Sequence, residues 1–313
     1  MEAASIGSSR KASMVDLRGL SWYALAKQAV NKSIKDDIFT SAAALAFYFL
    51  LSLFPALFFL TALLGFLAET GSAFRAMLLE YLETVMPESA YALIAPGLEE
   101  IRAGAEGWKL LVGMAGALWA AATAITAVVS GLNVAYSVTD ARPWWKVRLL
   151  SLGLMIVFVG MIVTALTMLL FGDHIGHRLA NLLGFSDAFR FVWGILRWVV
   201  VLFFVLLAFA LIYRYAPDLE NAHWDWITPG AVVGLVFWLL ISFVFRLYLA
   251  GFGAYNDVYG SLGAAIVLLL WLWFTGIALM LGGEANAVIE NAAAARGAAG
   301  AHLSGHKEPV PEA

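Results

Sequence analysis

The residues of this chain best suited to chemistry are polar side chains that stand at the ends of long apolar segments. If they meet in the folded protein, their carboxylates and guanidinium groups could bind an anionic substrate or carry a proton. Polar groups beside a hydrocarbon layer are costly and commonly functional. The sequence leaves a second interpretation open, in which these side chains pair and hold the helix ends together. In chain order they are Asp36, Asp37, Asn133, Tyr136, Arg142, Arg214, Asp218, Glu284 and Asn286.

Motifs of known enzyme classes are absent from the sequence. It contains no H-E-x-x-H zinc motif, no Walker A loop and no G-x-S-x-G turn, and it has no cysteine. His174 and His177 follow Asp173 in an expected short external loop. Two imidazoles and one carboxylate are a weak metal signal and are more typical of a solvated loop. We therefore expect no enzyme, with no catalytic residue, no metal and no cofactor.

Six long apolar segments must position the polar residues. The clearest spans 38–68, which contains 31 residues without a charged side chain. Because an α-helix rises about 1.5 Å per residue, roughly 20 apolar residues cross a bilayer core. The chain is 62% hydrophobic and only 13% charged, whereas a soluble domain carries about 25% charged residues. We predict an all-α membrane protein with six transmembrane helices, at about 42–67, 110–138, 149–171, 192–213, 227–245 and 258–283.

The distribution of positive charge predicts the orientation of these helices. Of the 19 lysines and arginines, 12 fall on the side that holds both termini, which the positive-inside rule assigns to the cytoplasm. The net charge of only -3 gives no basic field for nucleic acid. We expect three parts: a cytoplasmic N-terminal segment (1–37), a membrane domain (38–286) and a flexible cytoplasmic tail (287–313).

Two segments outside the spans show amphipathic patterns. Residues 14–35 mix apolar and basic residues, so they predict a helix that lies flat in the headgroup layer or packs against the bundle. Residues 68–109 form the largest external loop and carry apolar residues at helical spacing. This loop would act as a passive cap or as a gate.

Proline and glycine mark special positions inside the predicted spans. Pro55 interrupts the first span and predicts a kink, which transporters use and structural bundles also tolerate. Gly230 and Gly234 in the fifth span, and Gly260 and Gly263 in the sixth, predict close helix packing.

Several motifs, in order along the chain, resemble the YihY/BrkB family of bacterial inner-membrane proteins over about residues 20–290. They are Ala42 to Pro55, Asn133-x-x-Tyr136, Arg142-x-x-Trp145, Tyr213-x-x-x-Pro217, Pro229-Gly230-Ala231, Tyr259 to Ala264, and Gly283-Glu284-Ala285-Asn286. The resemblance implies six helices in the bacterial cytoplasmic (inner) membrane with both termini inside. The family carries old labels as a ribonuclease and as a virulence factor, and it has been suggested to handle envelope lipids.

These observations favour a transporter of a lipid or an amphipathic envelope precursor. Arg142 and Arg214 would meet an anionic lipid headgroup, and Glu284 would be a proton-linked carboxylate. The alternative is a structural or assembly factor of the cell envelope that transports nothing. A ribonuclease is disfavoured, since RNA cleavage needs metal ligands or an acid–base pair beside a basic groove. The expected partners are membrane lipids and no nucleic acid, and the sequence leaves the oligomeric state open.

Overall fold

The computed structural model describes residues 21–67, 80, 108–183, 187–219, 228–250 and 253–295. Within this part of the chain it contains seven helices and no strand. They are α1 (Trp22–Lys35), α2 (Ile38–Leu67), α5 (Trp108–Ala135), α6 (Trp144–Leu183), α7 (Asp187–Tyr215), α8 (Pro229–Ala250) and α9 (Gly253–Ala295). All but α1 are long and apolar enough to cross a membrane, which confirms the predicted all-α fold with six candidate spans.

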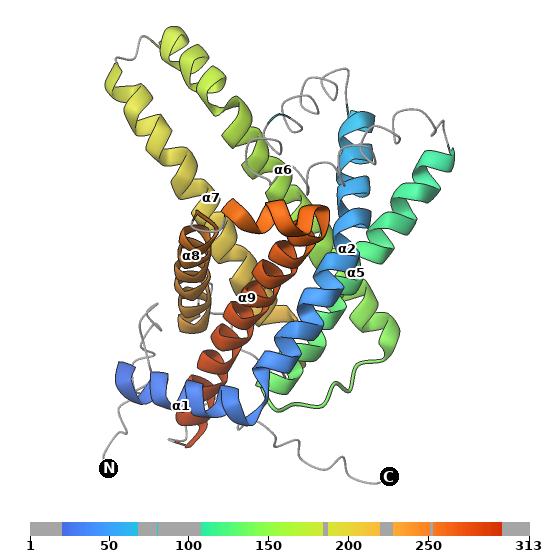
Figure 1. Ribbon diagram of the computed structural model, residues 1–313, viewed down its shortest axis with the longest axis vertical. Coiled ribbons are helices and arrows are strands. Elements are labelled where there is room, and N and C mark those ends of the chain that lie inside the picture. Colours follow the sequence, from blue (N-terminus) through green and yellow to red (C-terminus); the bar gives the residue numbers. More distant parts are fainter. Residues whose placement is uncertain are drawn as a thin grey trace, which may run out of the picture.

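Helix α9 lies at the centre of the bundle (Figure 1). Helices α2 and α5 lie side by side and both contact α9, while α8 packs along another side of it. Helices α6 and α7 pair as a hairpin, and α1 runs across one end of the bundle, where it contacts α9. We call this end of the bundle the α1 end.

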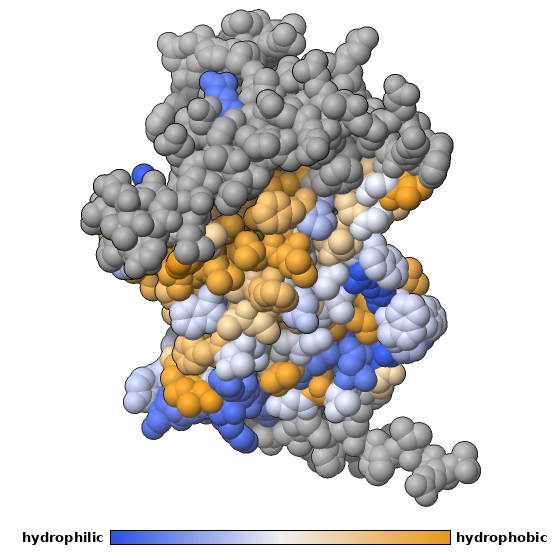
Figure 2. Space-filling model, turned by 45° about the vertical axis from the view of Figure 1, so that its right-hand side comes forward, coloured by the Kyte–Doolittle hydropathy of each residue, from blue (hydrophilic) through white to orange (hydrophobic). Residues whose placement is uncertain are grey.

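Apolar side chains divide between a narrow core and the outer surface. Leu45, Leu132 and Met280 are almost fully buried where α2, α5 and α9 meet. On the outer helices large side chains are exposed: Phe203 is half exposed and Phe243 is more than half exposed. Figure 2 shows the result: hydrophobic residues form a belt, and hydrophilic residues gather beside it toward the α1 end. This distribution is expected where lipid rather than water covers the outer surface.

Small residues allow the closest helix approaches. A Cβ atom on Gly230 would lie 2.2 Å from the carbonyl oxygen of Gly282, and one on Gly234 would lie 2.7 Å from the hydroxyl of Tyr213. Real Cβ atoms do not come this close, so α8 reaches α9 and α7 because these positions are glycine. Gly260 and Gly263 lie in α9.

Two helices continue past the ends expected from the sequence. The expected tail from 287 begins inside α9, which continues to Ala295 because Val288 and Ile289 are buried in a cluster with Leu25 of α1. His174 and His177 lie in α6, which continues to Leu183 alongside α7, and not in the expected loop. In both cases the helix continues past the apolar segment that the sequence marks.

Helix α1 resolves part of the choice left open for residues 14–35. It begins at Trp22, where the Ser21 hydroxyl caps it by accepting a hydrogen bond from the Ala24 N–H (3.1 Å). Leu25, Ala29 and Ser33, spaced one turn apart, are buried, so one face packs on the bundle. The opposite side exposes the large apolar residues Tyr23, Val30 and Ile34, and Trp22 is exposed at the first position of the helix. Most of loop 68–109 lies outside the described residues.

Candidate functional site

The predicted polar residues gather at the α1 end in separate hydrogen-bonded groups. The turn after α5 helps to bring them there. Ser137 adopts a left-handed conformation (φ 53°), and the N–H groups of Ser137 and Val138 donate to the carbonyls of Val134 (2.8 Å) and Asn133 (2.9 Å). This pairing is the Schellman arrangement that ends a helix. It leads the chain sharply from α5 toward α6.

The first set of residues, which we call the Glu284 group, consists of Lys32, Asp36 and Glu284. The Glu284 side chain is 0% exposed on α9, and its Oε2 lies 2.9 Å from Lys32 Nζ. Lys32 also pairs with Asp36, one turn further along α1, and donates to the carbonyl oxygen of Ala135 at the end of α5 (2.6 Å). Lys32 therefore ties α1 to both α5 and α9.

The Glu284 carboxylate is poorly satisfied for a group so deeply buried. Although Lys32 is within ion-pair distance, neither Glu284 oxygen accepts a well-directed hydrogen bond from the described residues. Two carboxylates and one ammonium leave one net negative charge when all three are ionised. Burying such an excess charge is expensive. The group is thus suited to take up a proton or another cation.

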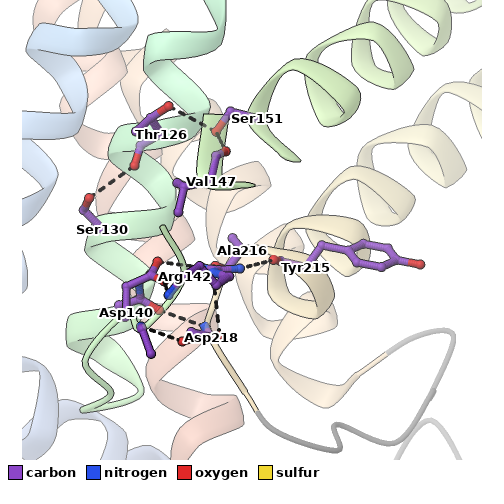
Figure 3. A network of polar contacts seen from close by, with 11 residues as sticks. Thr126, Ser130, Asp140, Arg142, Val147, Ser151, Tyr215, Ala216 and Asp218 are labelled. Carbon is purple, nitrogen blue, oxygen red and sulfur yellow. Dashed lines mark hydrogen bonds and ion pairs between the residues drawn. The ribbon is translucent and has the colours of Figure 1, made fainter. Parts of the chain in front are cut away.

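The second set, which we call the Arg142 group, consists of Asn133, Asp140, Arg142 and Asp218, of which the last three are labelled in Figure 3. The guanidinium of Arg142 donates from Nε to Asp140 Oδ1 (2.9 Å) and from Nη2 to Asp140 Oδ2 (2.7 Å). It also donates to the carbonyl oxygens of Ala216 (2.8 Å) and Tyr215 (3.3 Å). These carbonyls lie at the end of α7, where no further helical turn follows to donate to them. Arg142 therefore caps α7.

Asn133 and Asp218 complete the Arg142 group. The Asn133 side chain donates to Asp140 Oδ2 (3.0 Å) and accepts from the Asp218 N–H (2.9 Å). Asp218 in turn accepts from the Ala141 N–H (2.8 Å). Every member thus has directed partners, and the group joins the end of α5 and the segment before α6 to the end of α7.

The electrostatics of the Arg142 group agree with this geometry. Hydrogen bonds from Arg142 hold the pKa of the Asp140 carboxyl below its ordinary value. The same bonds raise the pKa of the Arg142 guanidinium. Both groups therefore stay charged, as expected for a permanent ion pair.

Asn286 belongs to a third contact, between α8 and α9. Its Oδ1 accepts from the Gly230 N–H (2.8 Å) and its Nδ2 donates to the Thr228 hydroxyl (2.9 Å). The same hydroxyl accepts from the Ala231 N–H (3.2 Å), so Thr228 and Asn286 together cap the start of α8. Tyr136 is buried close by, and its burial raises the pKa of the phenol, which stays neutral.

The remaining predicted residues lie at helix junctions. Asp37 is exposed and takes a left-handed conformation (φ 47°) in the turn between α1 and α2. Arg214 is partly buried in the last turn of α7. The prediction missed Lys32, Asp140 and Thr228. Signals for the first two were present, since Lys32 stands four residues before Asp36 and Asp140 two residues before Arg142.

Comparison with known proteins identifies the family. Residues 29–304 match the family model described as "Virulence factor BrkB". The chain belongs to the BrkB family. Its resemblance to that family is therefore confirmed. Among the described residues of this BrkB-family member, no group of three or more histidine, cysteine or acidic side chains could hold a metal ion.

Named relatives give little further information on activity. The ribonuclease-like protein YfkH of Bacillus subtilis (strain 168) is 36% identical over 250 residues, which cover 80% of this chain and 89% of YfkH. A UPF0761 membrane protein of Stenotrophomonas maltophilia (strain R551-3) is 25% identical over 262 residues, and the match covers 80% of this chain but only 57% of that protein. No solved structure matches the chain.

Proposed function

We propose that this membrane protein moves a lipid or an amphipathic envelope precursor across the bacterial cytoplasmic membrane, and that the Glu284 group carries a proton linked to this movement. The observation that supports the proposal is the fully buried Glu284 carboxylate, which shares one lysine with a second carboxylate and accepts no well-directed hydrogen bond from the described residues. The Arg142 group also holds two carboxylates for one cation, but there both carboxylates accept directed hydrogen bonds. The lack of such bonds at Glu284 therefore supports the assignment of the proton to the Glu284 group.

Protonation of the Glu284 group would change how helices are held together. Lys32 joins α1 to α9 through Glu284 and to α5 through the Ala135 carbonyl. A proton on Glu284 removes its electrostatic attraction for Lys32 and leaves Lys32 paired with Asp36. The contact between α1 and α9 then weakens, so proton binding biases the arrangement of helices at the α1 end. This is the kind of coupling that a proton-linked transporter needs.

We do not propose that Arg142 binds a lipid headgroup, as the sequence suggested. Its donors are directed to Asp140 and to the end of α7. Binding an anion there would require the loss of these bonds, each of which is charge-assisted. We therefore assign the Arg142 group to holding helix ends together.

The proposal is tested by lipid translocation in proteoliposomes at several pH values. We expect wild-type protein to move a fluorescent lipid at a rate that depends on pH. The Glu284→Gln protein should move the lipid at a rate that is independent of pH. Glu290→Gln is the matched control, because it removes a carboxylate from the same helix at a partly exposed position. It should keep the pH dependence. Unchanged pH dependence in a stably folded Glu284→Gln protein would sink the proposal.

The second candidate function is a structural or assembly factor of the envelope. The well-satisfied Arg142 group favours it, since that group only joins helices. If the protein is such a factor, vesicles with wild-type protein should show no more lipid translocation than protein-free vesicles at any pH. The same assay therefore separates the two functions.

A further inference from the structure

A groove between α2 and α5 carries an unusual number of hydroxyl groups for a membrane-spanning region. Its volume is about 360 Å³, which falls in the range of about 300–1,000 Å³ that is typical of small-molecule sites. Both helices contribute to its walls. The hydroxyl-bearing residues that line it are Ser41, Tyr48, Thr123, Thr126 and Ser130.

Arg148 of α6 lies beside this groove, where it contacts two of the residues that line it. Its Nη1 lies 3.3 Å from the Thr123 hydroxyl and 3.4 Å from the Thr126 hydroxyl. Its Nη2 donates to the Trp119 carbonyl, and the guanidinium carbon lies 4.2 Å from the centre of the Trp119 ring. Figure 3 shows Thr126 facing Ser151 between α5 and α6, where their hydroxyls are 3.1 Å apart. The guanidinium is thus held in place by hydroxyls, a carbonyl and an aromatic ring.

Arg148 differs from Lys32 and Arg142 because no carboxylate among the described residues accompanies it. Lys32 and Arg142 each pair with two carboxylates, whereas the described residues place no carboxylate in an ion pair with Arg148. Its Nε is buried and has no acceptor among them. Both α6 at Arg148 and α5 at Thr123 belong to candidate membrane spans. An arginine at such a position is expensive without an anion, and its planar donors match the oxygens of a phosphate.

The surroundings of the groove favour an amphiphile over a free anion. On α2, Phe47 and Leu51 are each more than half exposed next to the lining residue Tyr48, and Trp119 is half exposed on α5. Trp144 and Trp145 are exposed at the start of α6, one turn before Arg148, as expected for residues that anchor a helix at the headgroup level. A lipid can place its phosphate at Arg148 and its acyl chains on the apolar rim, while inorganic phosphate gains nothing from that rim.

We propose that the α2–α5 groove, with Arg148 beside it, binds the phosphodiester headgroup of an anionic membrane lipid. The inference rests on the proposed function in that it names the class of lipid and its site. In this arrangement Arg148 contacts the phosphate, the hydroxyls of Thr123 and Thr126 orient the guanidinium, and the remaining groove hydroxyls accommodate the polar headgroup.

The test measures equilibrium binding of phosphatidylglycerol to the full-length protein in detergent by native mass spectrometry. We expect Arg148→Gln to bind this lipid about tenfold more weakly or worse, as for the loss of a charge-assisted hydrogen bond. Lys146→Gln is the matched control, since it removes one positive charge from an exposed position of the same helix. It should change the affinity by less than about twofold. Equal binding by wild type and a stably folded Arg148→Gln protein would overturn the inference.

A second variant tests the groove independently of the arginine. Ser130 lines the groove at an exposed position, so Ser130→Trp should fill it without disturbing the core. We expect this variant to bind phosphatidylglycerol weakly although Arg148 is intact. Unchanged binding would place the lipid elsewhere and refute the groove as its site.

Two further arms identify the ligand. Phosphatidylcholine should bind more weakly than phosphatidylglycerol, and an excess of inorganic phosphate should not displace the lipid. Equal binding of the two lipids, or displacement by phosphate, would contradict the proposal of an anionic lipid. The Glu284→Gln protein should still bind phosphatidylglycerol. If that protein binds the lipid but translocation keeps its pH dependence, the proposed function fails while the lipid site stands.

Discussion

The Glu284 group and the Arg142 group have the same charges but different surroundings. Each contains two carboxylates and one cation, and both lie at the α1 end of the bundle. In the Arg142 group the carboxylates are about one-fifth exposed, and both accept directed hydrogen bonds. In the Glu284 group, Glu284 is completely buried and accepts none from the described residues. The two groups thus share a charge balance but differ in burial and hydrogen bonding, and on this difference we base the proposal that one joins helices and the other takes up a proton.

The largest effect expected from this comparison is on removal of Lys32. Lys32→Ala leaves Glu284 buried without its cation, which should lower the free energy of unfolding by about 3 kcal/mol. Reversible unfolding by SDS titration measures this change. The double variant Lys32→Met, Glu284→Gln should regain most of the loss, because no unpaired charge remains. A loss below about 1 kcal/mol would show that Lys32 does not compensate Glu284.

A smaller loss is expected when Arg142 is changed. Arg142→Ala removes the hydrogen bonds to Asp140 and to the end of α7, and should destabilise the fold by about 2 kcal/mol. Arg142→Lys should recover little, since lysine keeps the charge but lacks the fork that bonds both Asp140 oxygens. In proteoliposomes both variants should keep the pH dependence of translocation. Loss of the pH dependence in either variant would contradict the assignment of proton binding to the Glu284 group and of helix joining to the Arg142 group.

The smallest effect concerns the acid stability of the Arg142 group. Because the pKa of Asp140 is lower in the folded protein than in the unfolded chain, its contribution to stability is fully present above the unfolded value of about 4. That contribution falls as the pH drops through the folded-state pKa. Asp140→Asn should therefore show a shallower decrease of unfolding free energy below about pH 4 than wild type. Identical pH profiles would mean that Asp140 is no better stabilised when folded than when unfolded.

The fold was largely predictable because membrane crossing depends on local composition. Each of the six predicted spans overlaps one helix, since a long apolar segment has no other stable conformation in a bilayer. Helices α6 and α9 continue to Leu183 and Ala295, past the predicted spans, which end at 171 and 283. Val288 and Ile289 remain helical because they pack against α1, which no local pattern can reveal.

The candidate site was predictable as a list of residues but not as groups. Glu284, Asp36 and Arg142 were recognised from residue type and position, but the sequence did not show that they belong to separate groups. The structure separates them because α1 brings Lys32 to Glu284, whereas the turn after α5 brings Asp140 and Arg142 to the end of α7. Arg148 was read from the sequence only as a charge that sets orientation.

The sequence by itself determined that this is a membrane protein, how many spans it has and to which family it belongs. These properties depend on composition, segment length and the order of motifs along the chain. Only the tertiary structure decided which charges meet. Glu284 and Lys32 are separated by most of the chain, and their pairing follows from how α1 crosses the end of α9. Burial then separates the two groups, since a carboxylate enclosed by helices loses the water that would otherwise satisfy it.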